Sequence, residues 1–369
     1  MAIPFVDLKA QYKNIKTDID AAIAAVIDES AFIKGKYVKT FEEEFAKIYG
    51  VKHVVSCANG TDSLYIIMKM LGIGPGVEVI TAANSWISSA ETISQTGALP
   101  VFVDVHPEYY SMDETMLEKK ISSRTKALIA VHLQGQVCEM EKIQSICKKH
   151  NIHLIEDCAQ AHFSEYAGTR VGLMGIAGSF SFFPGKNLGA YGDAGCIITN
   201  DNDLAEKCRM FANHGALQKH HHQIEGINSR MDGLQAAILS AKLPYILTWT
   251  EKRIELAALY NTYLKGIPEI VLPKLRPGTK HTYHLYVILA DKRDALRDYL
   301  EKNAIETLIH YPTPLPALPA YKYLDHSSAD FPVATRLQPK ILSLPIYPEM
   351  TEEMIAFIAN AIHTFYKNK

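Results

Sequence analysis

The sequence predicts an α/β fold in which a mainly parallel sheet is covered by helices and a smaller α/β domain follows. Three observations lead to this prediction. Short apolar runs alternate with helical patterns between residues 50 and 200, these runs are apolar on both faces, and the sequence changes character after Gly266. Strands that are buried on both faces and separated by helices are typical of parallel sheets. The length of 369 residues also predicts two or three domains.

The strand predictions rest on short runs that are rich in β-branched and aromatic residues. We expect seven strands, at 53–57, 77–81, 100–105, 127–133, 153–157, 178–183 and 194–199. Apolar periodicity between several of these runs predicts helices at 61–71, 86–96, 114–121 and 139–149. Helices between strands are the connections that a parallel sheet requires.

The C-terminal part of the chain predicts a second domain. A long helical pattern covers 231–265, and Pro244 is expected to kink or split it. The elements expected after it are a strand at 281–290, a helix at 292–302, a strand at 305–309, a proline-rich loop at 312–319 and a helix at 351–367. We therefore predict an N-terminal arm and large domain over 1–245, and a connecting helix and small domain over 246–369.

Composition and charge exclude several classes of protein. The chain has 38 basic and 40 acidic residues, so it has no global field for binding nucleic acid or an anionic membrane. No apolar run approaches the ~18–20 residues needed to span a bilayer, and the first residues do not resemble a secretory signal. The six cysteines form no Cys-x-x-Cys pair, which favours small core residues in a reduced, cytoplasmic protein.

The segment Asn59-Gly60-Thr61-Asp62-Ser63 lies between an expected strand and an expected helix. Glycine allows a ligand to approach the backbone closely, and the free N–H groups of a first helical turn attract anions. A phosphate group would fit at this position. On this segment alone, a plain capped helix start is the more favoured interpretation.

Asp157, in the segment Glu156-Asp157-Cys158-Ala159-Gln160-Ala161-His162, follows an apolar strand at its carboxyl end. Open α/β sheets place ligand contacts at this edge. A carboxylate at the rim of an apolar sheet needs a cationic partner, such as a protonated ring nitrogen. A cap on the next helix explains the same residue equally well.

Lys186 lies in an aromatic turn that is rich in proline and glycine, in the sequence Ser181-Phe182-Phe183-Pro184-Gly185-Lys186-Asn187. Desolvation lowers the pKa of a lysine, and a neutral amine attacks a carbonyl to form a Schiff base. In isolation, an exposed turn lysine is the more favoured interpretation.

The three segments together favour a different conclusion. A phosphate cradle, a carboxylate for a pyridinium nitrogen and a Schiff-base lysine are the groups that a protein supplies to pyridoxal 5′-phosphate (PLP). The flat ring of this cofactor also needs a stacking face, for which Trp86 is the candidate, with a core tryptophan as the alternative.

The chain resembles the DegT/DnrJ/EryC1/StrS aminotransferases, which aminate keto groups on nucleotide-linked sugars. The resemblance extends nearly end to end and includes PFVDLKAQY, CANGTDSL, LIEDCAQAHFSEYAG, GSFSFFPGKNLGAYGDAGCI, GINSRMDGLQAAIL and IHYPTPLP. It implies the aspartate-aminotransferase-like architecture known as fold type I, in which the large domain binds PLP. It also implies a homodimer whose active sites lie at the subunit interface.

The resemblance also implies roles for individual residues. Lys186 resembles the Schiff-base lysine, Asp157 the partner of the pyridine nitrogen, and Gln160 a contact of the phenolic oxygen. The other implied cofactor residues are the phosphate ligands Gly60, Thr61 and Ser181, the stacking Trp86, and Asn228, which would reach the phosphate from the neighbouring subunit.

The expected reaction is a transamination from L-glutamate to the C3 keto group of a dTDP-linked 3-keto-6-deoxyhexose. Lys219 is a candidate contact for the diphosphate, His310 and Tyr311 for the sugar or nucleotide, and Arg230 for the carboxylate of the donor. The alternatives are C4 amination of a 4-keto sugar, a related enzyme that makes another amine, and a non-catalytic regulator. No metal site is expected, because the run His220-His221-His222 lacks a carboxylate partner at suitable spacing.

Overall fold

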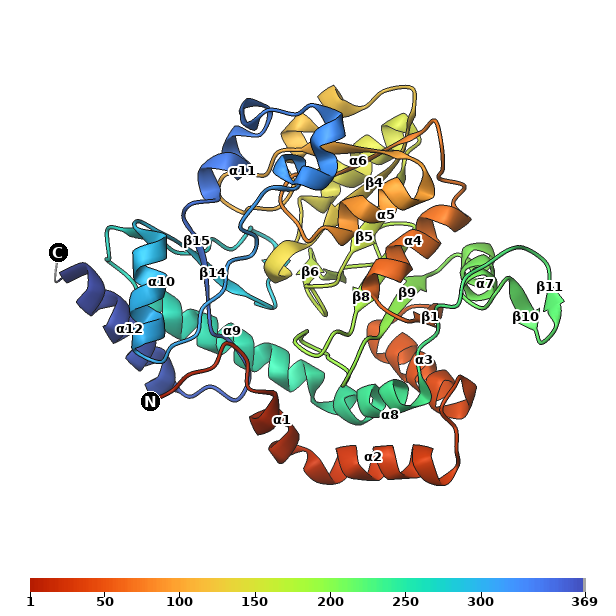
Figure 1. Ribbon diagram of the computed structural model, residues 1–369, viewed down its shortest axis with the longest axis horizontal. Coiled ribbons are helices and arrows are strands. Elements are labelled where there is room, and N and C mark those ends of the chain that lie inside the picture. Colours follow the sequence, from red (N-terminus) through yellow and green to blue (C-terminus); the bar gives the residue numbers. More distant parts are fainter. Residues whose placement is uncertain (368–369) are drawn as a thin grey trace.

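The computed structural model describes residues 1–367 and contains a large sheet of seven strands (Figure 1). The order of the strands is β1-β9-β8-β5-β4-β2-β3, and β9 is antiparallel to both of its neighbours, whereas the other pairs are parallel. The prediction of a mainly parallel sheet is therefore confirmed. The strands are β1 His53–Cys57, β2 Glu78–Ala82, β3 Leu99–Val103, β4 Thr125–Val131, β5 His153–Asp157, β8 Ala177–Ser181 and β9 Gly195–Thr199.

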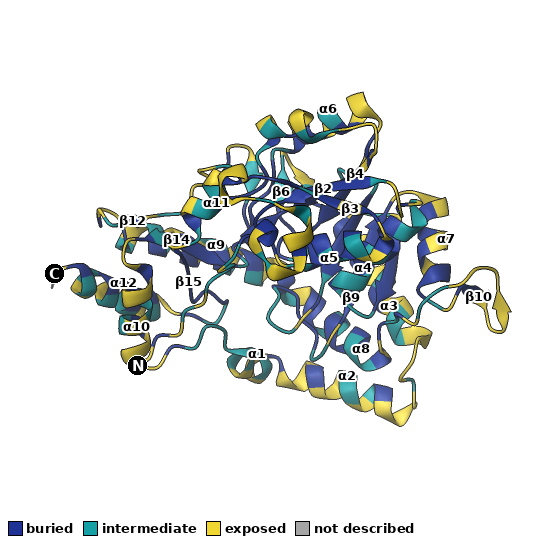
Figure 2. Cartoon of the chain, turned by 45° about the horizontal axis from the view of Figure 1, so that its top comes forward, coloured by how far each residue is buried: buried dark blue, intermediate teal, exposed yellow. Residues whose placement is uncertain are grey.

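Helices cover both faces of this sheet. Alternate residues of one strand enter different cores: in β4, Leu128 packs with one cluster and Ile129 with the other. One core receives residues from α3 Gly35–Tyr49, α6 Met140–His150 and α8 Gly233–Lys242, and the other from α4 Gly60–Met70, α5 Ser88–Thr96 and α7 Asn202–Phe211. Figure 2 shows the strands of the large sheet mostly in the colour of buried residues, which explains why they are apolar on both faces.

The long helical pattern that contains Pro244 connects the large sheet to a separate hydrophobic core, which we call the small-domain core. The pattern is split into α8, a 3-10 turn at Leu243–Tyr245 and α9 Ile246–Tyr263, as expected for a proline inside a helix. A sheet of order β12-β14-β15 follows, with β12 Ile270–Val271, β14 Tyr286–Ala290 and β15 Ile341–Leu344. It shares a hydrophobic cluster with α9, α10 Arg293–Lys302 and α12 Glu352–Lys367.

The remaining elements surround the large sheet and the small-domain core. The N-terminal helices α1 Leu8–Asn14 and α2 Lys16–Asp28 run along one side of the molecule, where α2 packs against α8 (Figure 1). The hairpin of β10 Ala216–Gln218 and β11 His221–His222 projects from the opposite end to the C-terminus and is exposed (Figure 2). The other elements are β6 Glu165–Tyr166, β7 Thr169–Arg170, β13 Thr279–Lys280 and α11 Pro332–Leu337.

Two element predictions are wrong. The expected helix at 114–121 is a pair of 3-10 turns, Glu114–Met116 and Glu118–Lys120. The two buried residues of this segment, Glu114 and Leu117, are three positions apart, which matches the three residues per turn of a 3-10 helix. The expected strand at 305–309 is reduced to isolated bridges, one of Ile305 with Ile3 and one of Leu308 with Ser343. The segment pairs with Ile3 at one end and with β15 at the other, so no single neighbouring strand among the described residues runs along its whole length.

Other features agree with the sequence or were not predicted. All six cysteines are buried and free, as expected for core residues. No helix in residues 1–367 is long and apolar enough to cross a membrane. The helices α1–α3, α7 and α11 and the strand β15 were not predicted.

Candidate active site

A pocket of about 660 Å³ opens at the carboxyl edge of the large sheet. The strands β1, β2, β4, β5 and β8 all point toward this edge, because β1 is antiparallel to β9 and β9 is antiparallel to β8. Nine predicted site residues line the pocket: Gly60, Thr61, Trp86, Asp157, Gln160, Ser181, Lys186, His310 and Tyr311. We call Gly60, Thr61, Asp157, Gln160, Ser181 and Lys186 the sheet wall, and Arg253, His284, His310 and Tyr311 the C-terminal wall.

The first turn of α4 forms one end of the sheet wall. Asn59 caps this helix, because its side chain accepts a hydrogen bond of 2.8 Å from the N–H of Asp62. A Cβ atom on Gly60 would lie 2.7 Å from Cβ of Ser181, so only glycine allows the helix start and the end of β8 to meet. The Thr61 and Ser88 hydroxyl groups are 2.7 Å apart at the same place. The cap that the sequence indicates is therefore present, and Gly60 packs closely against the end of β8 at a helix N-terminus that attracts anions.

Asp157 lies at the end of β5 and is only 7% exposed. Burial raises the pKa of its carboxyl group, and the N–H of Ala159 donates to Oδ1 at 3.1 Å and opposes that shift. No ion pair to Asp157 exists within 4.0 Å among residues 1–367. A buried carboxylate in this state favours a cationic ligand, which removes the desolvation penalty.

Gln160 is oriented by two hydrogen bonds. The backbone N–H of Gln134 donates to its Oε1 at 2.6 Å, and its Nε2 donates to the Tyr311 hydroxyl at 2.8 Å. The first bond fixes which end of the amide is the acceptor. The amide nitrogen therefore faces the pocket, where it has a second N–H to offer.

Lys186 follows β8 in a tightly folded loop. Its backbone N–H donates to the carbonyl of Phe183 at 2.8 Å, and the buried Lys242 holds the same loop by donating to the carbonyl of Gly189 at 2.7 Å. Burial lowers the pKa of the Lys186 amine to about 8, and the negative charge of Asp157 opposes this shift. The amine is therefore partly neutral near pH 7, which is the form that attacks a carbonyl.

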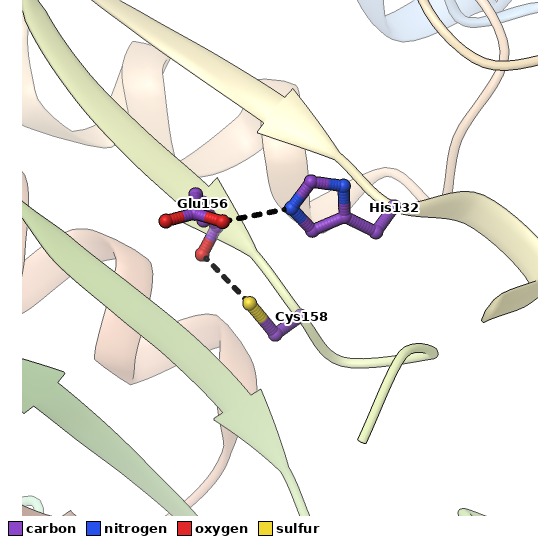
Figure 3. Close-up of side chains that lie close together, drawn as sticks. All are labelled: His132, Glu156 and Cys158. Carbon is purple, nitrogen blue, oxygen red and sulfur yellow. Dashed lines mark hydrogen bonds and ion pairs between the residues drawn. The ribbon is translucent and has the colours of Figure 1, made fainter. Parts of the chain in front are cut away.

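Beside Asp157, three buried side chains with metal-ligating atoms lie close together: His132, Glu156 and Cys158 (Figure 3). Nε2 of His132 is 3.1 Å from the Glu156 carboxylate, and backbone N–H groups of Gly172, Met174 and Gly175 donate to the same carboxylate at 2.6–2.7 Å. The oxygens of Glu156 are thus already used by donors. We interpret the cluster as a structural network that fixes the end of β5.

The C-terminal wall is built from segments far apart in the sequence. The rings of Trp86 and Tyr311 are 5.6 Å apart between centroids, and Nδ1 of His310 is 2.8 Å from the Ser343 hydroxyl. Burial lowers the pKa of His310 to about 4, so it is neutral near pH 7. Trp86 is 58% exposed, which rules out the alternative of a core tryptophan.

Three predicted residues do not line this pocket: Lys219, Asn228 and Arg230. Lys219 is exposed in the hairpin of β10 and β11, and Asn228 is exposed and bridges to Asn213. Arg230 instead lies near Lys34: burial lowers the pKa of the Lys34 amine, and the positive charge of Arg230 lowers it further. Conversely, sequence reasoning gave no site role to Arg253 or His284, because Arg253 lies within the long helical pattern at 231–265 and His284 within the strand expected at 281–290.

The residues present fit PLP. The closely packed turn at Gly60 suits a phosphate group, the unpaired Asp157 suits a protonated ring nitrogen, and the desolvated Lys186 suits an aldehyde. All three face one pocket.

Comparison with known proteins agrees with this geometry. The model of the DegT/DnrJ/EryC1/StrS aminotransferase family matches residues 13–363. The chain is 42% identical to the "Pleiotropic regulatory protein" of Geobacillus stearothermophilus over 100% of both chains. It is also 42% identical to the "dTDP-3-amino-3,6-dideoxy-alpha-D-galactopyranose transaminase" of Aneurinibacillus thermoaerophilus, over 98% of this chain and 99% of the relative.

A solved structure extends the agreement to the fold. The crystal structure of S. venezuelae DesV in complex with a ketimine intermediate superimposes with a TM-score of 0.97, at 39% identity, and covers 99% of both chains. The architecture is thus that of PLP aminotransferases, as the sequence predicted. The chain belongs to the DegT/DnrJ/EryC1/StrS aminotransferase family and is a PLP-dependent aminotransferase.

Proposed function

We propose that this protein transfers an amino group from L-glutamate to the C3 keto group of a dTDP-linked 3-keto-6-deoxyhexose. The products are 2-oxoglutarate and a dTDP-3-amino-3,6-dideoxyhexose. The observation that carries the proposal is the convergence of Lys186, Asp157 and the Gly60 turn on one pocket. The choice of sugar and nucleotide is supported by the name of the Aneurinibacillus relative.

In this proposal the sheet wall holds the cofactor. Gly60, Thr61 and Ser181 bind the phosphate, Asp157 pairs with the ring nitrogen, and Gln160 donates to the phenolic oxygen. Trp86, which is exposed at the mouth of the pocket, supplies the stacking face.

Bound PLP supplies an electron sink for the carbon that carries the amino group. Nζ of Lys186 would hold the aldehyde group of the cofactor, and in its free form it would take the proton from the amine-bearing carbon of the donor and later return it. The lowered pKa of about 8 suits this work, because the amine then both accepts and returns a proton near neutral pH. Asp157 would stay ionised beside a cationic ring nitrogen and would thereby keep that nitrogen protonated.

The remaining predicted residues support a homodimer with shared sites. Lys219, Asn228 and Arg230 lie outside the pocket of their own chain, and Asn228 is exposed. In a dimer, Asn228 would reach the phosphate of the second copy and Lys219 the diphosphate of the sugar nucleotide. His310 and Tyr311 would contact the sugar from the C-terminal wall.

A regulatory role is the second candidate, because the Geobacillus relative is named as a regulatory protein. The complete sheet wall supports an enzyme instead, since a regulator has no need for a desolvated lysine beside a buried acid. A purified protein that showed neither cofactor absorbance nor transamination would favour the regulator.

The substrate is tested by supplying purified enzyme and L-glutamate with 3-keto and 4-keto dTDP-sugars, each also in UDP-linked form. We expect 2-oxoglutarate to form with the dTDP-linked 3-keto sugar. Amination only at C4 would replace our assignment with the C4 alternative, and turnover only with UDP-sugars would replace the nucleotide.

A further inference from the structure

The positive charges of the pocket are few. Only two lysine or arginine residues line it among residues 1–367, Lys186 and Arg253. The two histidines that line it, His284 and His310, are neutral near pH 7, because burial lowers the pKa of both. Of the residues that a single chain supplies to the pocket, Arg253 is the remaining cation once Lys186 holds the cofactor.

Arg253 lies on α9 and is 4% exposed. Its Nη1 donates to the carbonyls of Tyr283, at 3.2 Å, and Ile346, at 2.8 Å, while its Nε is buried without a hydrogen-bond partner. No carboxylate lies within 4.0 Å of the guanidinium among the described residues. Buried guanidinium groups are normally paired, so this one has unused capacity to bind an anion.

The location of Arg253 suits a small anion that is joined to the reacting carbon. His284 lines the pocket. Burial lowers the pKa of its imidazole, and the positive charges of Lys186 and Arg253 lower it further, so both cations lie near this side chain. Burial lowers the pKa of Arg253 to about 10, with the charge of Glu349 opposing, so the guanidinium remains cationic near pH 7. The phosphate of the cofactor has its own donors at the start of α4.

We infer that Arg253, and not Arg230, binds a carboxylate of the amino donor. The inference rests on the proposed function, in which that donor is an amino acid and the acceptor is a sugar without a carboxylate. Arg253 therefore determines specificity for the donor and contributes little to recognition of the sugar. Arg230, the candidate from the sequence, lies outside the pocket that its own chain forms.

Two amines convert the PLP form of the enzyme to its aminated form, L-glutamate and the aminosugar product. The test compares the rates at which the enzyme reacts with each of them. Stopped-flow absorbance of the Arg253→Gln holoenzyme should show an apparent second-order rate constant for L-glutamate that is about 100-fold lower, as expected for loss of charged hydrogen bonds. The aminosugar product, which has no carboxylate, should react within about threefold of the wild-type rate. Arg253→Lys, which keeps the charge and loses the fork, should be about 10-fold slower with glutamate.

Binding provides a readout that does not depend on turnover. Glutarate is a dicarboxylate without an amine, and calorimetry on the holoenzyme should show the same order of affinity, Arg above Lys above Gln. Arg297→Gln, at an exposed arginine of α10, is the matched control and should leave both measurements unchanged. If Arg253→Gln does not fold, the glutarate affinity of Arg253→Lys decides alone.

Three results would overturn the inference. The first is an equal loss with glutamate and with the aminosugar, which indicates a purely structural role in holding Tyr283 and Ile346. The second is an unchanged glutarate affinity in both Arg253 variants. The third is a selective loss of glutamate in Arg230→Gln and not in Arg253→Gln. A wild-type enzyme that reacts with glutamate and not with the aminosugar refutes the proposed sugar, and glutarate binding then tests Arg253 independently.

Discussion

The two walls of the pocket are built in different ways. The sheet wall comes from the carboxyl ends of β5 and β8 and from the short segments that follow β1, β5 and β8, and its groups are held by close contacts such as the approach of Gly60 to Ser181. The C-terminal wall comes from α9, the segment before β14 and the segment at 308–311. The first wall is fixed by the register of one sheet, whereas the second exists only because the small-domain core packs beside it.

This difference indicates a division of labour. A fixed sheet edge suits a cofactor that stays in place, since catalytic groups on rigid elements keep their geometry. The C-terminal wall suits substrates that differ from one reaction to another, because the residues of its segments can be replaced without disturbing the sheet. Substitutions in the sheet wall should therefore affect every substrate, and those in the C-terminal wall should affect substrates selectively.

The largest expected effect is that of Lys186→Ala in the sheet wall. Turnover should fall by at least about 10⁴-fold with every substrate, because both the attachment point and the acid–base group are lost. The visible absorbance of the covalently attached cofactor should disappear in the same spectrum. Lys39→Ala, at an exposed lysine of α3, is the control. Full activity of Lys186→Ala would refute the role.

Asp157→Asn should reduce kcat by roughly 10²–10³-fold with every substrate, because the charge that keeps the ring nitrogen protonated is lost. The stability of the apo chain should not fall. Burial raises the folded-state pKa of Asp157 above 3.8, so its ionised form destabilises the fold, and neutralisation removes that penalty at pH 7. The difference in unfolding free energy should vanish as the pH falls toward 3.8. A marked loss of apo stability would mean that the carboxylate is structural.

Gly60→Ala should raise the dissociation constant for PLP by about 10–100-fold, because the new Cβ would lie 2.7 Å from Cβ of Ser181 and force the cradle apart. Equilibrium dialysis measures this effect. The control is Gly74→Ala, whose Cβ would meet nothing closer than 3.6 Å. Equal PLP affinity in the two variants would show that the cradle tolerates a side chain.

The pH dependence of cofactor capture tests the state of Lys186. Its pKa is lowered to about 8, so the neutral amine increases as the pH rises through 8 and then saturates. The rate at which apo-enzyme captures PLP should rise about tenfold between pH 7 and 9 and then level off. An ordinary lysine would give a rate that continues to rise toward pH 10, and that profile would contradict desolvation of the amine.

The smallest effect is expected in the C-terminal wall. Tyr311→Phe removes the hydroxyl that accepts a 2.8 Å hydrogen bond from Gln160, which should cost about 1 kcal/mol or about fivefold in kcat/KM for the ketosugar. The glutamate half-reaction should change less. Tyr323→Phe, at a tyrosine that is 62% exposed, is the control. An equal loss in both half-reactions would remove the distinction between the walls.

The comparison of the walls also explains which predictions from sequence succeeded. The strands of the large sheet, the split at Pro244 and the α4 turn depend on local patterns and turn chemistry. Asp157 was found because it ends an apolar strand, and Lys186 because it lies in the turn that leaves the next strand of the sheet, and both positions are at the ligand-binding edge. The 3-10 turns near Leu117 were missed because the helical pattern there is weak and only Glu114 and Leu117 become buried in that segment.

The amino-acid sequence alone predicted the α/β class, the cofactor and the six residues of the sheet wall, of which Gln160 and Ser181 came only from the family resemblance. Strand register carries such residues to one edge whatever else packs around them. Only the tertiary structure decided that Arg253, and not Arg230, faces the pocket, and that Gln160 meets Tyr311 across 151 positions of sequence. The reason is that contacts between the two cores depend on how whole domains pack, and no local pattern of side chains encodes that packing.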